Sequence, residues 1–154
     1  MWVENIIREI QRQVGGGRRT VNVAAGGAAL TAEVRQADSL AGALDSLTVV
    51  LPGVPPALDE AGRTLASSVT YLLEPLAVLE IGTDRVLLRS RPPRTRDRSA
   101  EYYELWLRAA GESTAVDLRR YRTQRHQSGR EVLPMTFTWE QVLHLLNDLE
   151  TIFL

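Results

Sequence analysis

The sequence predicts an α+β fold in which three principal helices accompany mainly antiparallel strands in one or two sheets. Three observations predict it. Apolar residues recur at helical spacing in three segments, alternate with polar residues in the segments between, and are interrupted there by short glycine-containing turns typical of hairpins. The expected order is helix, three strands, helix, four or five strands, helix. Residues 1–154 fit a single domain, although two β-meander-plus-helix halves (15–74 and 75–154) around a shared core are an alternative.

The N-terminal part predicts a helix followed by a hairpin. Five apolar residues fall at helical spacing, namely Val3, Ile6, Ile7, Ile10 and Val14. The glycines of 15–17 would end this helix. Two alternating runs, 20–24 and 30–35, flank Gly26 and Gly27, which predicts a tight turn between two strands. The second strand would face the core with Leu30, Ala32 and Val34.

Residues 38–47 are consistent with two structures. The spacing of Leu40, Leu44 and Leu47 suits a short helix, with Asp38 or Ser39 as its N-cap. A strand is the alternative for this segment, and the pattern leaves both open.

A third strand and the second helix follow. The β-rich run 47–51 ends at Pro52 and Gly53, and Pro55–Pro56 suits the first turn of a helix. Its apolar stripe comprises Leu58, Ala61, Leu65, Val69, Leu72 and Leu73, and Pro75 would end it.

The second half repeats this logic. Runs 76–81 and 85–90 flank a short turn, which predicts another hairpin. Residues 91–99 hold two prolines and four arginines, so we expect an exposed mobile loop. Strands are predicted at 101–108, at 114–123 and at 132–137.

We expect the strand at 132–137 to bend at Pro134. Thr138 and Gln141 form a capping box at the start of the last helix. The main apolar stripe of that helix comprises Trp139, Val142, Leu143, Leu146, Leu149 and Phe153.

Composition narrows the chemistry. The chain has no cysteine, and every one of its 18 basic residues is arginine. These absences exclude thiol nucleophiles, cysteine-ligated zinc, Schiff-base lysines and the lysine of a phosphate-binding loop. Of the two histidines, we expect His126 in a solvated turn and His144 on a polar helix flank. We therefore expect no enzyme, no cofactor and no metal site, and a cytoplasmic protein without a membrane span.

The net charge of -1 hides a segregation along the chain. Residues 1–84 carry 6 arginines against 10 acidic residues, and residues 132–154 carry 3 acidic residues and no arginine. Between them, residues 85–131 carry 12 arginines against 6 acidic residues. An anionic partner would therefore dock on the middle segment.

Two predicted strands carry the most specific candidate site. If 101–108 and 114–123 are neighbours, alternation places aromatic and arginine side chains together on one sheet face, namely Tyr102, Trp106, Arg108, Arg119 and Tyr121. Five further arginines would extend this face from nearby connections, namely Arg89, Arg91, Arg94, Arg96 and Arg98. Such a face suits single-stranded nucleic acid, because bases stack on rings and arginine takes phosphates. The alternative is an outer face on which arginines lie over the rings and pair with Glu104 and Asp117.

The last helix has a second apolar edge formed by Leu145, Ile152 and Leu154. An exposed apolar edge marks an interface, which would fit a homodimer, whereas burial within one chain is an equal alternative.

Two resemblances accompany these patterns. The element order is similar to that of the secretion-chaperone-type fold, which implies protein partners and a dimer. The strand Val116–Tyr121, the Gly129–Arg130 turn and the Thr138-capped helix resemble the end of the Whirly-type single-stranded DNA-binding domain. We expect a non-enzymatic interaction or adaptor domain that binds a protein partner as a dimer, with single-stranded nucleic-acid binding as the alternative.

Overall fold

The computed structural model describes residues 2–13 and 17–153, and it confirms the α+β class and the predicted element order. Its elements are α1 (Trp2–Gln13), β1 (Arg19–Ala25), β2 (Ala28–Ala37), β3 (Ala41–Pro52), α2 (Leu58–Ser68), β4 (Leu76–Ile81), β5 (Arg85–Ser90), β6 (Arg94–Arg96), β7 (Ser99–Ala110), β8 (Ser113–Gln124), β9 (Glu131–Leu133), β10 (Met135–Thr138) and α3 (Trp139–Phe153).

One antiparallel sheet joins both halves of the chain. Its main strands follow the order β1-β2-β3-β8-β7-β5-β4. Three short strands pair beside this path: β10 with β3, β6 with β7 and β9 with β8. The two halves meet where β3 pairs with β8, from Leu47 opposite Leu118 to Pro52 opposite Ser113. The halves 15–74 and 75–154 thus contribute strands to the same sheet.

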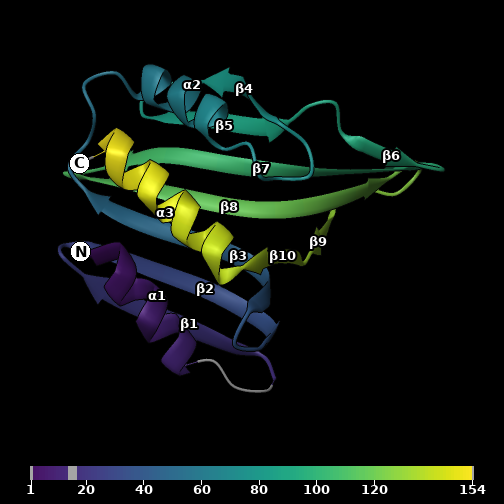
Figure 1. The fold of residues 1–154 in the computed structure, drawn as a ribbon. Coiled ribbons are helices and arrows are strands. Elements are labelled where there is room, and N and C mark those ends of the chain that lie inside the picture. The colour runs from purple at the N-terminus through teal and green to yellow at the C-terminus, as the bar shows by residue number, and fades with distance from the viewer. Residues whose placement is uncertain (1, 14–16, 154) are drawn as a thin grey trace.

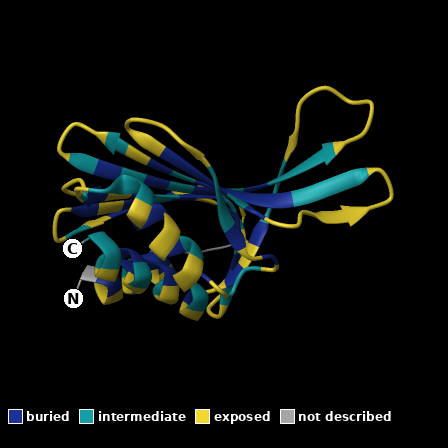
Figure 2. Cartoon of the chain, turned by 90° about the horizontal axis from the view of Figure 1, so that it is seen from above, coloured by how far each residue is buried: buried dark blue, intermediate teal, exposed yellow. Residues whose placement is uncertain are grey.

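All three helices lie on one side of this sheet (Figures 1 and 2). Helix α1 packs on β1, α2 packs on β4 and β5, and α3 contacts both other helices. The core lies between the helices and the inner sheet face, because alternate strand residues point toward it. Fully buried members include Ile6, Leu30, Leu65, Leu105 and Leu146. We call the opposite side of the sheet the outer face, and none of the three described helices lies on it. None of the described helices is long and apolar enough to span a bilayer.

Residues 38–47 form a turn and the start of β3, so the helix alternative is wrong. The Oδ1 atom of Asp38 accepts hydrogen bonds from the backbone N–H groups of Leu40 and Ala41 at 2.8 and 2.9 Å. Asp38 therefore caps a turn instead of a helix, and Leu40 is exposed.

The misleading spacing of Leu44 and Leu47 arises from a bulge. Val34 pairs with Leu44 and Glu33 with Ser46, so Asp45 is an extra residue in β3. This insertion shifts the alternation by one position, which lets Leu44 and Leu47 both face the core. On the outer face Asp45 pairs with Arg35 at 2.6 Å.

Three other boundaries differ from expectation. Helix α2 ends at Ser68, because Val69 is extended while its N–H still donates to the Leu65 carbonyl. The stripe was therefore predicted too long, and Leu73 is exposed. Residues 94–96, expected in a loop, pair with β7 as β6. The single strand predicted at 132–137 is divided at Pro134 into β9, which pairs with β8, and β10, which pairs with β3.

The capping box of α3 is confirmed. The Gln141 N–H donates to Thr138 Oγ1 at 3.1 Å, and the Thr138 N–H donates to Gln141 Oε1 at 2.9 Å. The adjoining Trp139 ring is fixed by a 2.9 Å hydrogen bond from its Nε1 to the Asp38 carbonyl.

Gly42→Ala should destabilise the fold. A Cβ at this position would lie 2.8 Å from the Cη2 atom of Trp139, a ring that its hydrogen bond holds in place. We expect a loss of about 1–3 kcal/mol in the free energy of unfolding, measured by urea denaturation. Ala43→Val, on the outer side of the same strand, is the control and should change it by less than about 0.5 kcal/mol. Equal effects of both variants would contradict this assignment.

Candidate functional site

Strands β7 and β8 are neighbours along their whole lengths. The register sets Tyr102 opposite Tyr121, Glu104 opposite Arg119 and Trp106 opposite Asp117. Side chains alternate between the two faces of a strand, and Leu105 and Leu118 point into the core beneath the helices. The residues named above therefore point away from the helices. The outer face therefore brings together Tyr102, Trp106, Arg108, Arg119 and Tyr121, in the arrangement that sequence alternation predicts.

Arginines of the same chain lie over these rings. The guanidinium carbon of Arg108 is 4.7 Å from the ring centroid of Trp106. Arg89 lies at 4.7 Å over Tyr102, and Arg130 at 3.6 Å over Tyr121. Cations at these distances are attracted by the ring quadrupole. Tyr102 is also only 7% exposed, so it is not an open stacking platform.

A buried carboxylate organises the arginines. Glu104 is 3% exposed, and it accepts from Nε of Arg89 at 3.0 Å on one oxygen. Its other oxygen lies 2.9 Å from Nη1 of Arg130. Asp117 pairs similarly with Nε of Arg119 at 3.2 Å. Because buried charges are tolerated only when paired, Glu104 requires these guanidinium groups nearby.

We call this assembly the outer cluster. It comprises Leu87, Arg89, Tyr102, Glu104, Trp106, Arg108, Asp117, Arg119, Tyr121 and Arg130. All of its members except Leu87, Arg89 and Tyr102 line a mostly polar hollow of about 250 Å³. Small-molecule pockets are larger and mainly apolar, so the hollow is poorly suited to a drug-sized ligand.

Sequence patterns missed two members of the outer cluster. Leu87 is buried and pairs directly opposite Trp106, which requires that β5 lie beside β7. Sheet order is not encoded in local periodicity. Arg130 reaches the face from the turn before β9, where no alternation indicates a direction.

Arg94, Arg96 and Arg98 lie apart from the outer cluster, so the prediction of one common face is wrong for them. Arg94 pairs opposite Glu101 of β7. Glu101 lies two residues before Tyr103, whose side chain points to the inner side of the sheet, so the Glu101 side chain points to that side too. Alternation therefore directs Arg94 and Arg96 to the side away from Trp106, and Arg98 lies in the turn between β6 and β7.

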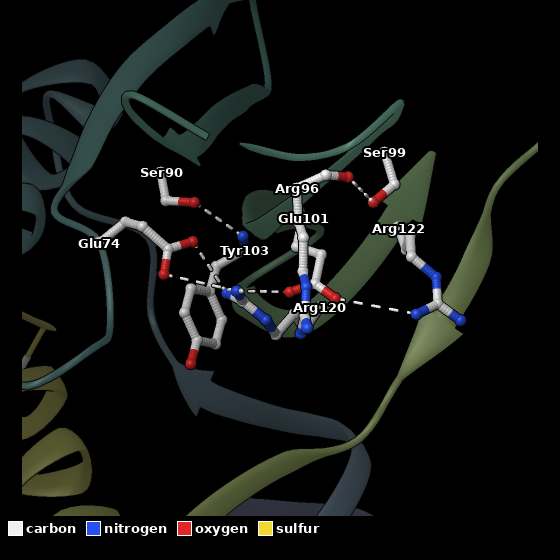
Figure 3. A network of polar contacts seen from close by, with 8 residues as sticks. All are labelled: Glu74, Ser90, Arg96, Ser99, Glu101, Tyr103, Arg120 and Arg122. Atoms are coloured by element: carbon white, nitrogen blue, oxygen red, sulfur yellow. Dashed lines mark hydrogen bonds and ion pairs between the residues drawn. The ribbon is translucent and has the colours of Figure 1, made fainter. Parts of the chain in front are cut away.

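On the inner side, where the sheet continues past the helices, a polar network replaces the apolar core (Figure 3). Arg120 is 4% exposed and donates to both carboxylate oxygens of Glu74, at 3.0 and 3.4 Å. Its guanidinium lies 4.3 Å over the Tyr103 ring and 3.8 Å from Glu101. This network ties the segment after α2 to β8.

Of the residues predicted to form a helical interface, Leu145 is buried and Ile152 is partly buried. Leu145 is 4% exposed and belongs to the core, so burial within one chain accounts for it. Ile152 packs partly buried against the same core. Leu154 lies outside the described residues.

Neither histidine lies in a group of side chains that could bind a metal ion, among the described residues. His126 is exposed in a turn, as expected, and His144 is exposed beside the Tyr71 ring, 6.0 Å away. The Tyr71 hydroxyl donates to Asp148 at 3.1 Å. Among residues 2–13 and 17–153, no three His, Asp or Glu side chains are grouped to hold a metal ion.

No family model matches the sequence, and no curated protein and no solved structure is significantly similar to it. The resemblances to secretion chaperones and to Whirly-type domains therefore stay at the level of element order and residue types.

Removing one partner of the Arg120–Glu74 pair should be costly. In Arg120→Met the Glu74 carboxylate would stay buried without its cation, so we expect a loss of about 3–5 kcal/mol in the free energy of unfolding. Arg120→Met/Glu74→Leu, which removes both charges, should recover most of it. Chemical denaturation of both variants tests this, and additive losses in a double-mutant cycle would contradict it.

Stability should fall at alkaline pH. Burial raises the pKa of Tyr103 above 10.0, and burial with the nearby Asp148 raises that of Tyr71 further. The folded state thus favours neutral phenols, so this contribution is complete below pH 10 and is lost as the pH rises above it. The chain has no lysine, so tyrosines are the side chains that titrate there. Urea titrations across this range should show a flatter decline in Tyr71→Phe/Tyr103→Phe, and an unchanged decline would refute the assignment.

Proposed function

We propose that this chain is a non-catalytic protein-interaction domain that self-associates through the outer face of its sheet. The outer cluster is the observation that carries the proposal. It gathers tryptophan, tyrosine and arginine side chains on the face that the described helices leave uncovered (Figure 2). These three residue types dominate the binding energy of protein interfaces.

The outer cluster is preorganised for docking. Arg89 and Arg130 are held by Glu104, and Arg119 is held by Asp117. Side chains already fixed by ion pairs and ring contacts lose little conformational entropy when a partner covers them. This lowers the cost of association.

The charges of the outer cluster favour a protein partner over a nucleic acid. Glu104 and Asp117 stand among the arginines and offset part of their charge, which weakens the attraction of a phosphate backbone. The arginines over Trp106 and Tyr121 occupy the ring faces on which bases would stack. The outer cluster therefore supports single-strand binding less well than protein binding.

A second copy of the chain is the partner that the charges fit. On the outer face Arg119 and Asp117 are both partly exposed, at 41% and 20%, so the surface is a strip that presents both signs of charge. In a two-fold dimer each surface meets itself, so a strip of both signs can place unlike charges opposite each other.

Trp106→Ala should weaken self-association. Truncation of one central aromatic anchor costs about 2 kcal/mol and both copies lose theirs, so we expect the dimer dissociation constant to rise at least about thirtyfold. Sedimentation velocity over a concentration series measures it. Arg119→Glu, which reverses a charge on the same face, should act in the same direction.

Leu40→Ala is the matched control, because it removes an exposed apolar side chain away from the outer cluster. It should leave the sedimentation profile unchanged. A monomer at every accessible concentration of the unaltered chain would refute self-association, and equal effects of Leu40→Ala and Trp106→Ala would refute this face as the interface.

A further inference from the structure

The far ends of β7 and β8 form an arm that projects past the helices (Figures 1 and 2). We define the arm as residues 91–103 and 120–131. Its acidic residues are Asp97, Glu101 and Glu131, and its arginines are Arg91, Arg94, Arg96, Arg98, Arg120, Arg122, Arg125 and Arg130. The arm therefore carries most of the arginines of residues 85–131.

Four of these arginines surround one hollow at the arm tip. The hollow has a volume of about 540 Å³ and is lined by Arg96, Arg98, Arg122 and Arg125, with Asp97 as its one acidic lining residue. Two separate turns build it. The backbone N–H of Arg125 donates to the Arg98 carbonyl at 2.8 Å, which fastens the β6–β7 turn to the end of β8.

The tip arginines differ from those of the outer cluster in their partners. Arg122 pairs with Glu131 at 2.6 Å and lies 3.9 Å from Glu101. Within residues 2–13 and 17–153, no carboxylate lies within 4.0 Å of the guanidinium nitrogens of Arg96, Arg98 or Arg125. All three residues are exposed, so their charges face solvent.

We propose that the arm tip binds the phosphodiester backbone of single-stranded nucleic acid. Each guanidinium presents a planar fork of donors that matches phosphate oxygens, and a basic groove that tracks the backbone is how such proteins bind without base readout. The site is distinct from the outer cluster, and the proposal does not depend on self-association.

The composition of the tip favours a nucleic acid over other anionic partners. Protein interfaces are anchored by aromatic and apolar side chains, whereas the lining holds only Arg, Asp, Ser and Gln. The same lack of apolar side chains leaves nothing to insert into a lipid surface. A phosphate backbone needs neither, because released counterions supply most of the affinity.

The test is fluorescence anisotropy with labelled oligothymidylate, a single strand that carries the backbone without base pairing. We expect the full chain to bind at low salt, with affinity falling as salt rises. Arg96→Ala/Arg98→Ala should weaken binding about tenfold and reduce the slope of log K against log salt by about 1.4, since each lost contact is worth about 0.7. Arg96→Lys/Arg98→Lys, which keeps both charges, should retain most of the slope.

Arg8→Ala/Arg12→Ala is the matched control, because it removes two exposed arginines from α1 and changes net charge equally. It should bind like the unaltered chain. Absence of binding at low salt, an equal loss in this control, or a loss with Trp106→Ala but not with the arm variant would each overturn the proposal. Arm-dependent binding of polyglutamate or of anionic vesicles, without binding of oligothymidylate, would overturn it in favour of those partners.

Discussion

The antiparallel pairing of β7 with β8 is the constraint on which the rest of the structure depends. Each strand has 12 residues, and they pair from Ser99 opposite Gln124 to Ala110 opposite Ser113. Because side chains alternate across a strand, this one register decides for both strands which residues enter the core and which face outward. A slip of β8 by one residue would bury Arg119 and expose Leu118, and a slip of β7 would do the same to Trp106 and Leu105. The outer cluster is thus a direct consequence of the register that builds the core.

The length of this hairpin creates a second requirement. The strands continue past the helices (Figure 1). Their inner side is therefore covered by helices along one part of the hairpin and uncovered along the rest. Leu105 and Leu118 pack under the helices, whereas Arg120 further along β8 is buried by Glu74 and the Tyr103 ring. Beyond that point Arg122 is one-third exposed and bound to Glu131. Polarity on the inner side therefore rises with distance from α2 and α3.

The sequence correctly predicted the features that depend on residues close together in the chain. The α3 capping box, the hairpin between β4 and β5 and the shared face of Trp106 and Tyr121 follow from side-chain chemistry and alternation. The predictions failed where contacts between distant segments of the chain determine the structure. A bulge at Asp45 imitated helical spacing, and the position of β5 beside β7 could not be known before the sheet was assembled. The prediction that Arg94, Arg96 and Arg98 share a face with Trp106 failed. In the register of β6 on β7, Arg94 and Arg96 pair with Glu101 and Ser99, which point to the side of the sheet opposite Trp106.

The basic middle segment therefore separates into two sets of arginines that the sequence cannot distinguish. Arg89, Arg119 and Arg130 are compensated by carboxylates on the outer face, so they contribute little net field there. Arg96, Arg98 and Arg125 lack such partners in the described structure and lie at the end of a projecting arm. Net charge alone assigns both sets to an anionic partner. Pairing divides them, because the carboxylate beside a paired arginine offsets its attraction for a phosphate, whereas an arginine that faces solvent offers its full charge.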